Sequence, residues 1–560
     1  MSVELHGTGV SPGVGTGPVR ILAGSVPEPA AGERHDGDAA AERARAHDAL
    51  NTVAADLEER GVKAGGEAQD VLAAQAMMAR DPGLADLVDG KIDGGLTAAR
   101  AVYEAFGTFR EALAGAGDYL AGRVADLDDI RDRAVARLQG LPMPGVPVSD
   151  DPFVLVARDL APADTALLDP ASVVAFVTEE GGPTSHTAIL ARAMGVPAVV
   201  ACPGCTDLAE GTVVLVDGAA GSITVDPPAD VVTAARDRAG ARGKAMSEAT
   251  GPGRTADGHK VPLLANIGGP KDVAAAVANG AEGVGLYRTE FLFLDRADAP
   301  TVAEQEAAYR AALEAFPDGN VVVRVLDAGA DKPLAFLPPP GAEPNPALGE
   351  RGLRMLQRYP DVLTDQLRAL AGAAAGLTAK LQVMAPMVAD VDDARSFVAA
   401  CREAGIQCAG VMIEIPAAAL RARDIAGEVD FFSLGTNDLA QYAFAADRQV
   451  GALARLQDPW QPALLDLVAA AAAASGDAGK SCGVCGEAAG DPALACVLAG
   501  LGVTSLSMSA PSLPLARAAL ARHTLDACRR AAAAARAATS ADGARTAAHA
   551  ELTGLPGLGL

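Results

Sequence analysis

One histidine of the chain lies in a sequence setting that suits phosphoryl transfer. His186 follows the run Gly-Gly-Pro-Thr-Ser at 181–185, in which the glycines and the proline predict a tight loop and the last two residues are good N-cap residues. A short helix is expected over 188–194, ended by Gly195. The positive end of such a helix binds anions and lowers the pKa of an imidazole, which keeps the ring neutral and nucleophilic. His186 is therefore a candidate phosphoryl acceptor, and a capping or structural role is the alternative.

Four arginines lie in motifs that suit the binding of an anionic substrate. A planar guanidinium group holds a carboxylate or a phosphate through two contacts, and phosphoryl transfer depends on charge neutralisation more than on covalent help. The four candidates are Arg288, Arg324, Arg351 and Arg448. Each of them, taken singly, could instead form an ordinary surface salt bridge.

Two acidic residues, each of which follows a predicted strand, could bind a divalent cation. Glu414 and Asp438, together with substrate oxygens and water, suit Mg²⁺, which prefers octahedral oxygen ligands. Asp438 ends the run Ser-Leu-Gly-Thr-Asn-Asp at 433–438, a glycine-containing turn whose amides could also face a phosphate. The competing interpretation is a glycosidase, which uses paired carboxylates, but such a site does not require this many anion-binding arginines.

The cysteines raise two further possibilities. Cys485 could give or take a proton, because a thiol pKa is tunable across neutral pH; the alternative is a buried structural cysteine. Two pairs of the eight cysteines have C-x-x-C spacing, Cys202/Cys205 and Cys482/Cys485, which could indicate zinc. Each pair fits better at the end of a strand-like apolar run, and the pairs are far apart in sequence, so zinc is the less favoured interpretation.

Length, composition and charge restrict the class of protein. At roughly 150 residues per domain, 560 residues predict three or four domains. The net charge of −25 and the pI near 4.7 argue against nonspecific nucleic-acid binding. No apolar run approaches the roughly 20 residues of a membrane span, and the first ten residues lack a signal-peptide pattern. We therefore expect a cytoplasmic protein without membrane insertion.

The second half of the chain predicts the scaffold that positions the candidate residues. From His259 onward, eight apolar runs alternate with helical stretches, which is the number expected of a (β/α)₈ barrel. The runs are 261–267, 283–286, 321–326, 381–387, 410–413, 431–434, 481–484 and 504–508. Chemistry in such barrels collects where the strands end. The charged or polar residues at those positions are Arg288, Arg324, Asp327, Glu414, Asn437, Asp438 and Cys485.

The first half predicts an α/β unit that is interrupted by helices. Strand-like runs occur within 3–22 and return at 153–157, 173–178, 198–201, 213–217 and 222–225. From about 38 to 138 the periodicity is helical, as in Val102, Phe106 and Phe109. Residues 21–145 carry 22 acidic and 13 basic side chains, which indicates either a solvated surface or a docking face for a basic partner. The simplest topology joins the strands on both sides, so that the helical module is an insertion.

Several of these motifs resemble a known superfamily. The run ending at His186 resembles the phosphohistidine loop shared by enzyme I of the bacterial sugar phosphotransferase system, pyruvate phosphate dikinase and phosphoenolpyruvate synthase. The runs 285–291, around Glu414, 436–438 and 485–487 resemble enzyme I in its order and at near its spacing, as do 118–120, Arg123, 129–130 and 159–165. The resemblance extends from about Val3 to past Met508. Pro183 stands where enzyme I often has arginine, and Val325 and Ala330 are mild departures outside the charged set.

This resemblance implies a role for each candidate residue. His186 would carry the phosphoryl group, Thr165 would orient it, and Cys485 would protonate the enolpyruvate carbon. Phosphoenolpyruvate would bind to Arg288, Arg324, Arg351, Asn437 and Arg448. Mg²⁺ would be held by Glu414 and Asp438. Pyruvate would be released, and the phosphoryl group would pass to a histidine of the carrier protein HPr, the first step of sugar uptake.

The resemblance also implies an α/β multidomain fold with a swivelling phosphohistidine domain. The expected segments are 1–25 and 146–229 for the phosphohistidine domain, 26–145 for the helical HPr-binding insertion, 230–258 for a linker helix and hinge with a joint at 251–253, and 259–560 for the barrel. The barrel would bind phosphoenolpyruvate and form a homodimer.

Three alternatives were weighed against enzyme I. A dikinase or synthase would add an ATP-binding domain, but only about 180 residues precede His186, and the helical insertion fills most of them. A nitrogen-system paralogue would carry a sensory domain before the first strand. The sequence leaves no room for one there, so this alternative is not expected. A regulatory scaffold with a decayed site is disfavoured by the complete set of charged residues.

Overall fold

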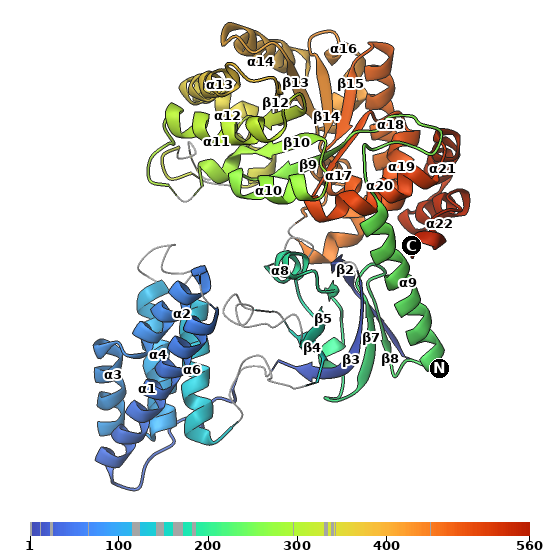
Figure 1. Ribbon diagram of the computed structural model, residues 1–560. Helices are drawn as coiled ribbons and strands as arrows, with labels where there is room; N and C mark the ends of the chain where they lie inside the picture. The colour runs from blue at the N-terminus through green and yellow to red at the C-terminus, as the bar shows by residue number, and fades with distance from the viewer. Residues whose placement is uncertain are drawn as a thin grey trace. The chain divides into compact units, whose positions relative to one another are not determined.

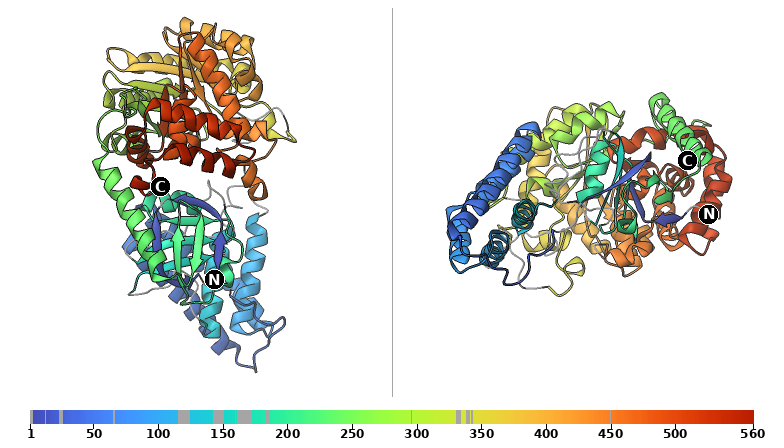
Figure 2. Two further views of the ribbon diagram at one scale, coloured as in Figure 1. Left: turned by 90° about the vertical axis from the view of Figure 1, so that its right-hand side faces the viewer. Right: turned by 90° about the horizontal axis from the view of Figure 1, so that it is seen from below.

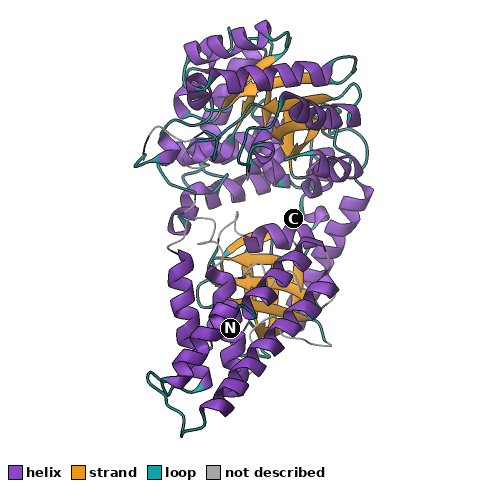
Figure 3. Cartoon of the chain, turned by 90° about the vertical axis from the view of Figure 1, so that its left-hand side faces the viewer, coloured by secondary structure: helices purple, strands orange, loops and turns teal. Residues whose placement is uncertain are grey.

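The computed structural model describes residues 3–11, 13–22, 26–64, 66–114, 124–141, 151–158, 160, 172–181, 186–294, 296–329, 334–337, 341, 343–448 and 450–560. The chain divides into two compact units, residues 1–236 and 237–560. Strands form a sheet in the first unit and a barrel in the second, and helices make up most of the remaining structure (Figures 1 and 3).

The first unit contains an eight-stranded sheet with the order β1-β8-β7-β3-β4-β5-β6-β2. Its strands are β1 (Glu4–His6), β2 (Thr8–Ser11), β3 (Val14–Ile21), β4 (Phe153–Ala157), β5 (Val173–Thr178), β6 (Ala198–Val200), β7 (Val213–Asp217) and β8 (Ser222–Val225). The central strands β3 to β6 run parallel, and the outer neighbours pair antiparallel.

Both faces of this sheet are apolar. Phe153 and Leu155 of β4 belong to one hydrophobic cluster, and Val154 and Val156 belong to another. Because successive side chains of a strand point to opposite faces, a strand covered on both sides is apolar at every position. Helix α8 (His186–Met194) contributes Ala188 and Ala191 to the first of these clusters.

A helical segment lies between β3 and β4 in the chain. Its described helices are α1 (Ala39–Ala64), α2 (Gly66–Ala79), α3 (Pro82–Asp93), α4 (Ala98–Ala114) and α6 (Val124–Gln139). They share their own core, in which the predicted Val102 and Phe106 are buried, and they run side by side (Figures 1 and 2). Val19 of β3 nevertheless pairs with Val154 of β4. The helices are therefore inserted into the chain path of a continuous sheet.

The second unit is a closed barrel of eight parallel strands, which confirms the predicted fold class. The strands are β9 (Leu263–Ile267), β10 (Gly283–Arg288), β11 (Asn320–Arg324), β12 (Lys380–Ala385), β13 (Ala409–Ile413), β14 (Phe431–Leu434), β15 (Ser481–Val484) and β16 (Ser505–Met508). Each overlaps one predicted run. Inward-facing side chains fill the barrel interior: Leu286, Val322, Met384, Met412, Phe431 and Cys485.

Helices surround the barrel strands (Figures 1 and 2). They are α10 (Pro270–Ala278), α11 (Val302–Ala315), α12 (Leu353–Arg358), α13 (Pro360–Ala374), α14 (Val391–Glu403), α15 (Pro416–Leu420), α16 (Ala422–Ile425), α17 (Thr436–Ala443), α18 (Pro462–Asp477), α19 (Pro492–Gly500) and α20 (Leu513–Arg522), followed by α21 (Leu525–Ala537) and α22 (Ala541–Glu551). Their apolar side chains and the outward-facing side chains of the strands form the main core of the unit.

The boundary between the units falls inside α9 (Ala229–Glu248). The glycine-proline-glycine joint predicted at 251–253 follows this helix. Gly251 is exposed with φ +82°, whereas Gly253 is buried and its N–H donates to the Glu282 carboxylate at 2.7 Å. One end of the predicted joint is thus fastened to the barrel unit, and the hinge itself stays a prediction.

Candidate active site

The residues predicted in the second half of the chain gather at one end of the barrel. Two of them are the last residue of a strand, Arg288 of β10 and Arg324 of β11, and the others closely follow one: Glu414 after β13, Asn437 and Asp438 after β14, and Cys485 after β15. Because all eight strands run parallel, their carboxyl ends lie at the same mouth of the barrel, which is where barrel enzymes place their chemistry.

Two of the four arginines are buried among opposite charges. Arg324 Nη2 lies 2.8 Å from Glu290 Oε1, and Arg324 Nη1 lies 3.4 Å from Asp327 Oδ2. Arg351 donates to Asp327 through Nη2 at 2.8 Å and Nε at 3.3 Å. Arg324, Arg351, Glu290 and Asp327 are at most 6% exposed, and we call them the buried charge cluster. Buried charges persist only when paired, so this pairing holds both guanidinium groups in place before a substrate arrives.

A chain of neutral polar side chains supports the buried charge cluster. The backbone N–H of Leu326 donates to Gln366 Oε1 at 2.9 Å, and Gln366 Nε2 donates to Tyr309 Oη at 3.0 Å. Tyr309 in turn donates to Gln305 Oε1 at 3.2 Å. All three side chains are buried. They connect α11 and α13 to the segment between Arg324 and Asp327, and they therefore help to set its position.

Glu414 is a buried carboxylate that is only half satisfied. Its Oε1 accepts a hydrogen bond from the Met387 N–H at 2.7 Å, while Oε2 has no hydrogen-bond partner in the described part of the chain. Burial, followed by the charges of Asp438 and Asp327, raises the pKa of Glu414 to about 7. Met387 adopts a left-handed backbone with φ +57°, a conformation that is strained for a residue with a side chain.

Asp438 links the buried charge cluster to the outer arginine Arg448. Its two oxygens lie 3.4 Å from Arg351 Nη1 and 3.6 Å from Arg448 Nη1. An orphaned Glu414 oxygen close to a second carboxylate is the kind of donor set that a hard divalent cation binds. The predicted pair Glu414 and Asp438 therefore fits Mg²⁺, with further ligands from substrate and water.

Two arginines at the mouth are much more exposed, and we call Arg288 and Arg448 the outer arginines. Their side chains are 38% and 32% exposed. Arg288 Nη2 lies 4.0 Å from Glu487 Oε1, and the Glu487 N–H donates to Asn437 Oδ1 at 3.1 Å. These longer and more solvated contacts leave the outer arginines free to reorient toward a ligand.

Cys485 lies at the inner end of this arrangement. The Ser433 hydroxyl donates to Cys485 Sγ at 3.2 Å, and the thiol lies 3.5 Å from the carbonyl oxygen of Leu434. Burial raises the pKa of the Cys485 thiol to about 11, and the hydrogen bond from Ser433 acts in the opposite direction. The thiol is thus protonated at neutral pH, as a proton donor must be.

Two glycines allow the loops at the mouth to approach one another. A Cβ on Gly435 would lie 2.8 Å from Glu414 Oε2, and a Cβ on Gly486 would lie 1.9 Å from Thr436 Oγ1. Glycine is therefore required in the 433–438 and 485–487 runs because a side chain would collide with neighbouring atoms, and not because the backbone adopts a left-handed φ.

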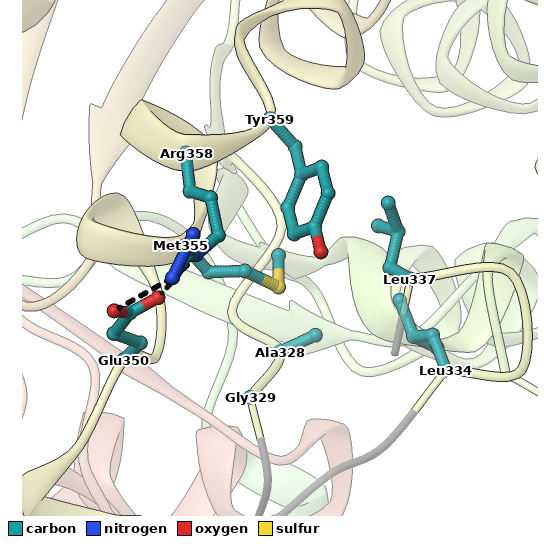
Figure 4. Close-up of a pocket in the computed structure, with 8 residues that line it drawn as sticks. All are labelled: Ala328, Gly329, Leu334, Leu337, Glu350, Met355, Arg358 and Tyr359. Atoms are coloured by element: carbon teal, nitrogen blue, oxygen red, sulfur yellow. Dashed lines mark hydrogen bonds and ion pairs between the residues drawn. The ribbon is translucent and has the colours of Figure 1, made fainter. Parts of the chain in front are cut away.

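A small pocket is lined by residues several of which neighbour Asp327 and Arg351 in the sequence (Figure 4). Its lining is Ala328, Gly329, Leu334, Leu337, Glu350, Met355, Arg358 and Tyr359. The Glu350 carboxylate and the Arg358 guanidinium pair with each other at 2.7 Å along one side. This mostly apolar pocket does not contain any of the predicted site residues.

His186 belongs to the first unit. It is the first residue of α8, so the predicted short helix is confirmed and begins two residues earlier than expected. Gly195, with φ +67°, follows its end as predicted. Residues 182–185, the His186 side chain and Thr165 lie outside the described residues, as do Tyr119 and Arg123 of the helical segment.

Sequence reasoning missed several residues that the tertiary structure brings into the site. Glu290 stood in a recognised motif and Asp327 at a strand end, yet neither received a role; the pairing of two arginines with two acids was the available signal. Gln366 and Met387 carried no sequence signal. The Gln366 side chain accepts from the backbone N–H of Leu326, and Met387 donates its own backbone N–H to Glu414, so neither contact depends on a recognisable pair of side chains.

Comparison with known families defines the class of the protein. Family models of PEP-utilising enzymes match three parts of the chain: the N-terminal domain at 6–123, the mobile domain at 149–221 and the PEP-binding domain at 243–525. The last match contains the whole barrel mouth described above.

Curated relatives narrow this class. The chain is 66% identical to the phosphoenolpyruvate-protein phosphotransferase of Streptomyces coelicolor over 99% of this chain and 100% of that protein. The proteins of the same name from Haloferax volcanii and Staphylococcus carnosus are 43% and 39% identical, each over 86% of this chain, covering 86% and 87% of the relatives. The chain belongs to the phosphoenolpyruvate-protein phosphotransferase family of PEP-utilising enzymes, which confirms the resemblance to enzyme I.

The described residues contain neither a membrane-spanning helix nor a preformed cluster of metal ligands. No helix among them is long and apolar enough to cross a membrane. No group of three or more His, Cys, Asp or Glu side chains within the described ranges is arranged to hold a metal ion. A magnesium site built on Glu414 and Asp438 would therefore depend on ligands from the substrate.

Proposed function

We propose that the chain transfers the phosphoryl group of phosphoenolpyruvate to His186, releases pyruvate, and passes the phosphoryl group to a histidine of the carrier protein HPr. The observation that carries this proposal is the convergence of four arginines, the carboxylates Glu414 and Asp438, and a protonated thiol at one mouth of the barrel. A phosphate and a carboxylate on one small substrate require this density of guanidinium groups.

The charge balance of the mouth supports a divalent cation. The buried side chains Arg324 and Arg351 face four carboxylates, those of Glu290, Asp327, Glu414 and Asp438, all at most 6% exposed. The outer arginines Arg288 and Arg448 balance this charge over the mouth as a whole, but its buried part keeps an excess of negative charge that would repel an anionic substrate. We propose that Glu414 and Asp438 hold Mg²⁺, which when bound neutralises the excess and stabilises the charge on the phosphoryl oxygens.

The chain's own residues then have distinct tasks in the transfer. Arg324 and Arg351, fixed by Asp327, provide a preorganised positive surface that needs little rearrangement as charge develops. Arg288, Arg448 and Asn437 would close on the substrate from the solvent side. His186 would attack phosphorus in line with the departing enolate oxygen, so the phosphorus–oxygen bond breaks as the nitrogen–phosphorus bond forms.

Cys485 would complete the release of pyruvate. Departure of the phosphoryl group leaves enolpyruvate, which becomes the ketone when its terminal carbon takes a proton. A buried thiol whose pKa is about 11 carries that proton at neutral pH, and Ser433 donates to the sulfur and so stabilises the thiolate that remains. Cys485→Ala should therefore exchange phosphoryl groups but release pyruvate roughly 10²–10⁴-fold more slowly.

The remaining assignments follow the family resemblance. We propose that Thr165 orients His186, that residues 1–25 and 146–229 form the phosphohistidine domain, and that the helices within 26–145 bind HPr. Residues 230–258 would join the phosphohistidine domain to the barrel at 259–560. The protein would form a homodimer through this barrel. The insertion of the helices between β3 and β4 supports this division.

The decisive experiment labels the full-length protein with radioactive phosphoenolpyruvate and Mg²⁺. Wild type should acquire acid-labile, base-stable label, and His186→Ala should acquire none while retaining its circular dichroism spectrum. His6→Ala, which changes an exposed histidine of the same unit, should be labelled like wild type. Label that persists in His186→Ala would reject His186 as the acceptor.

The magnesium site has a separate test. Glu414→Ala and Asp438→Ala should each shift the Mg²⁺ titration of labelling to higher concentration or abolish labelling. Asp424→Ala, which removes a partly exposed carboxylate of the same barrel, is the matched control. Unchanged Mg²⁺ titrations in both site variants would contradict the proposed ligands.

A further inference from the structure

The first unit contains a pair of cysteines that the proposed phosphoryl transfer does not use. Cys202, Pro203, Gly204 and Cys205 form the turn between β6 and the short helix 205–207. The Cys205 N–H donates to the Cys202 carbonyl at 3.3 Å, and Gly204 has φ 77° and ψ 6°. Proline followed by glycine with these angles is the signature of a type II turn.

Such a turn brings its end residues within the reach of a disulfide. The Cα atoms of the first and last residues of a β-turn lie less than about 7 Å apart, and a disulfide requires about 4.4–6.8 Å. Each thiol shifts the pKa of the other, as neighbouring thiols do. Both residues are fully buried, in the apolar cluster on the opposite face of the sheet from α8.

The same spacing elsewhere in the chain does not have this effect. Cys482 and Cys485 lie on and directly after β15, where a separation of three residues points side chains to opposite faces. Cys482 accordingly joins the outer core of the barrel unit, and Cys485 joins the cluster inside the barrel. The type II turn, and not the C-x-x-C spacing, brings Cys202 and Cys205 together.

The two thiols of the turn differ in acidity. Interaction with the Cys205 thiol lowers the pKa of Cys202, and the same interaction raises the pKa of Cys205. The lower pKa favours Cys202 as the nucleophile and leaves Cys205 as the resolving thiol.

The turn is also fastened to the strand that leads toward His186. The Cys202 N–H donates to the Thr178 carbonyl at 3.0 Å. The Glu179 carboxylate accepts from Thr206 Oγ1 at 2.6 Å and from the Gly204 N–H at 3.4 Å. Thr178 ends β5, so the turn is fastened to the end of the strand that precedes His186 in the chain.

We propose that Cys202 and Cys205 are a reversible dithiol–disulfide site oxidised by small hydroperoxides. The Cys202 thiolate attacks one peroxide oxygen, the oxygen–oxygen bond breaks, and the departing oxygen leaves as water or alcohol, which gives a sulfenic acid. The Cys205 sulfur then attacks the Cys202 sulfur, the sulfur–oxygen bond breaks, and water leaves with the Cys205 proton. Two thiols are oxidised and one peroxide is reduced. A small oxidant suits fully buried sulfurs, which are reached by local opening.

The test uses full-length protein treated with hydrogen peroxide, alkylated after denaturation and digested with trypsin. The peptide 193–236 contains Cys202 and Cys205 and no other cysteine. It should lose two hydrogens, incorporate no alkyl group, and recover two alkylation sites after reduction. In Cys205→Ser, the sulfenic acid on Cys202 should instead be trapped by dimedone.

Two internal controls make the result decisive. Cys408 is the one cysteine that is not fully buried, and its oxidation shows that the peroxide acted. The peptide that contains Cys482 and Cys485 should show no bridge between these two residues. Full alkylation of Cys202 and Cys205 under conditions that oxidise Cys408 would overturn the proposal, as would bridging of either cysteine to another peptide.

Discussion

Arg324 and Arg351 lie deep in the barrel mouth and share Asp327 between them, whereas the outer arginines Arg288 and Arg448 are about one third exposed. The four have the same chemistry and equivalent sequence signals. The buried two serve the fold and the substrate together, because without their acidic partners they would be uncompensated charges. The outer two pair over 3.6–4.0 Å and contribute little to stability, which leaves them available for binding.

The largest effect should come from removing the acid between the buried arginines. Asp327→Ala leaves two guanidinium groups buried without their main partner, so the free energy of unfolding should fall by about 3–5 kcal/mol and activity should be lost. Urea unfolding measures the change. Asp365→Ala, which breaks the exposed pair with Arg368, should change stability by less than about 1 kcal/mol. Equal effects of the two substitutions would remove the distinction between buried and outer charges.

Substitution of an outer arginine should separate activity from stability. Arg288→Ala and Arg448→Ala each remove a charge-assisted contact worth about 1.5–3 kcal/mol, so kcat/KM for phosphoenolpyruvate should fall roughly 10–100-fold. Their urea midpoints should match that of Arg421→Ala, a control at an arginine with a 72% exposed side chain. A stability loss comparable to that of Asp327→Ala would show that these arginines also hold the fold together.

Substitution of Glu414 should raise stability while it abolishes activity. Its pKa is raised to about 7, so its contribution to stability is complete below the unfolded value near 4.5 and is lost as pH rises through 7. In metal-free buffer at pH 8, Glu414→Gln should therefore be more stable than wild type, by about 3 kcal/mol, although inactive. This advantage should vanish below the unfolded value near 4.5, and it should shrink when Mg²⁺ is added to wild type. A stability difference that does not vary with pH would contradict the buried, charge-repelled carboxylate.

The smallest effect should come from the polar chain behind the buried charge cluster. Gln366→Leu deprives the buried Leu326 N–H of its acceptor and should cost about 1 kcal/mol of stability. Because Leu326 lies between Arg324 and Asp327, KM for phosphoenolpyruvate should rise more than kcat falls. Gln357→Leu, at an exposed glutamine that donates to Asp393, should leave both constants unchanged. Normal kinetics in Gln366→Leu would limit this glutamine to a packing role.

Much of the fold was predictable because its signals are local. Eight apolar runs of strand length separated by helical stretches led to a barrel, and each run overlaps an observed strand. Asp81 caps α3 and Pro82 is its first residue, a start that an aspartate followed by proline favours locally. Loop and capping residues likewise predicted α8, to within two residues of its observed start at His186. These features depend on neighbours within a few residues, which a single sequence displays.

Long-range partnership was not predictable from the same sequence. Which arginine is buried depends on how β11 and the loop before α12 pack around Asp327, and Glu290 acts as an anchor only because η2 (Thr289–Leu292) brings it to Arg324. Gln366 acts through a backbone N–H forty residues away along the chain. Burial and pairing are properties of the assembled barrel, so they left no pattern in the spacing of residues.

The two C-x-x-C motifs show which features the sequence determines and which ones only the tertiary structure decides. The sequence by itself determined their spacing, and proline and glycine at the centre of 202–205 favoured a turn, while the apolar run at 481–484 favoured a strand. Only the tertiary structure decided that one pair of thiols lies together in one apolar cluster and that the other pair divides between the core and the barrel interior. The physical reason is that side-chain direction follows backbone conformation, but the surroundings of a side chain are created by segments that are distant in the chain.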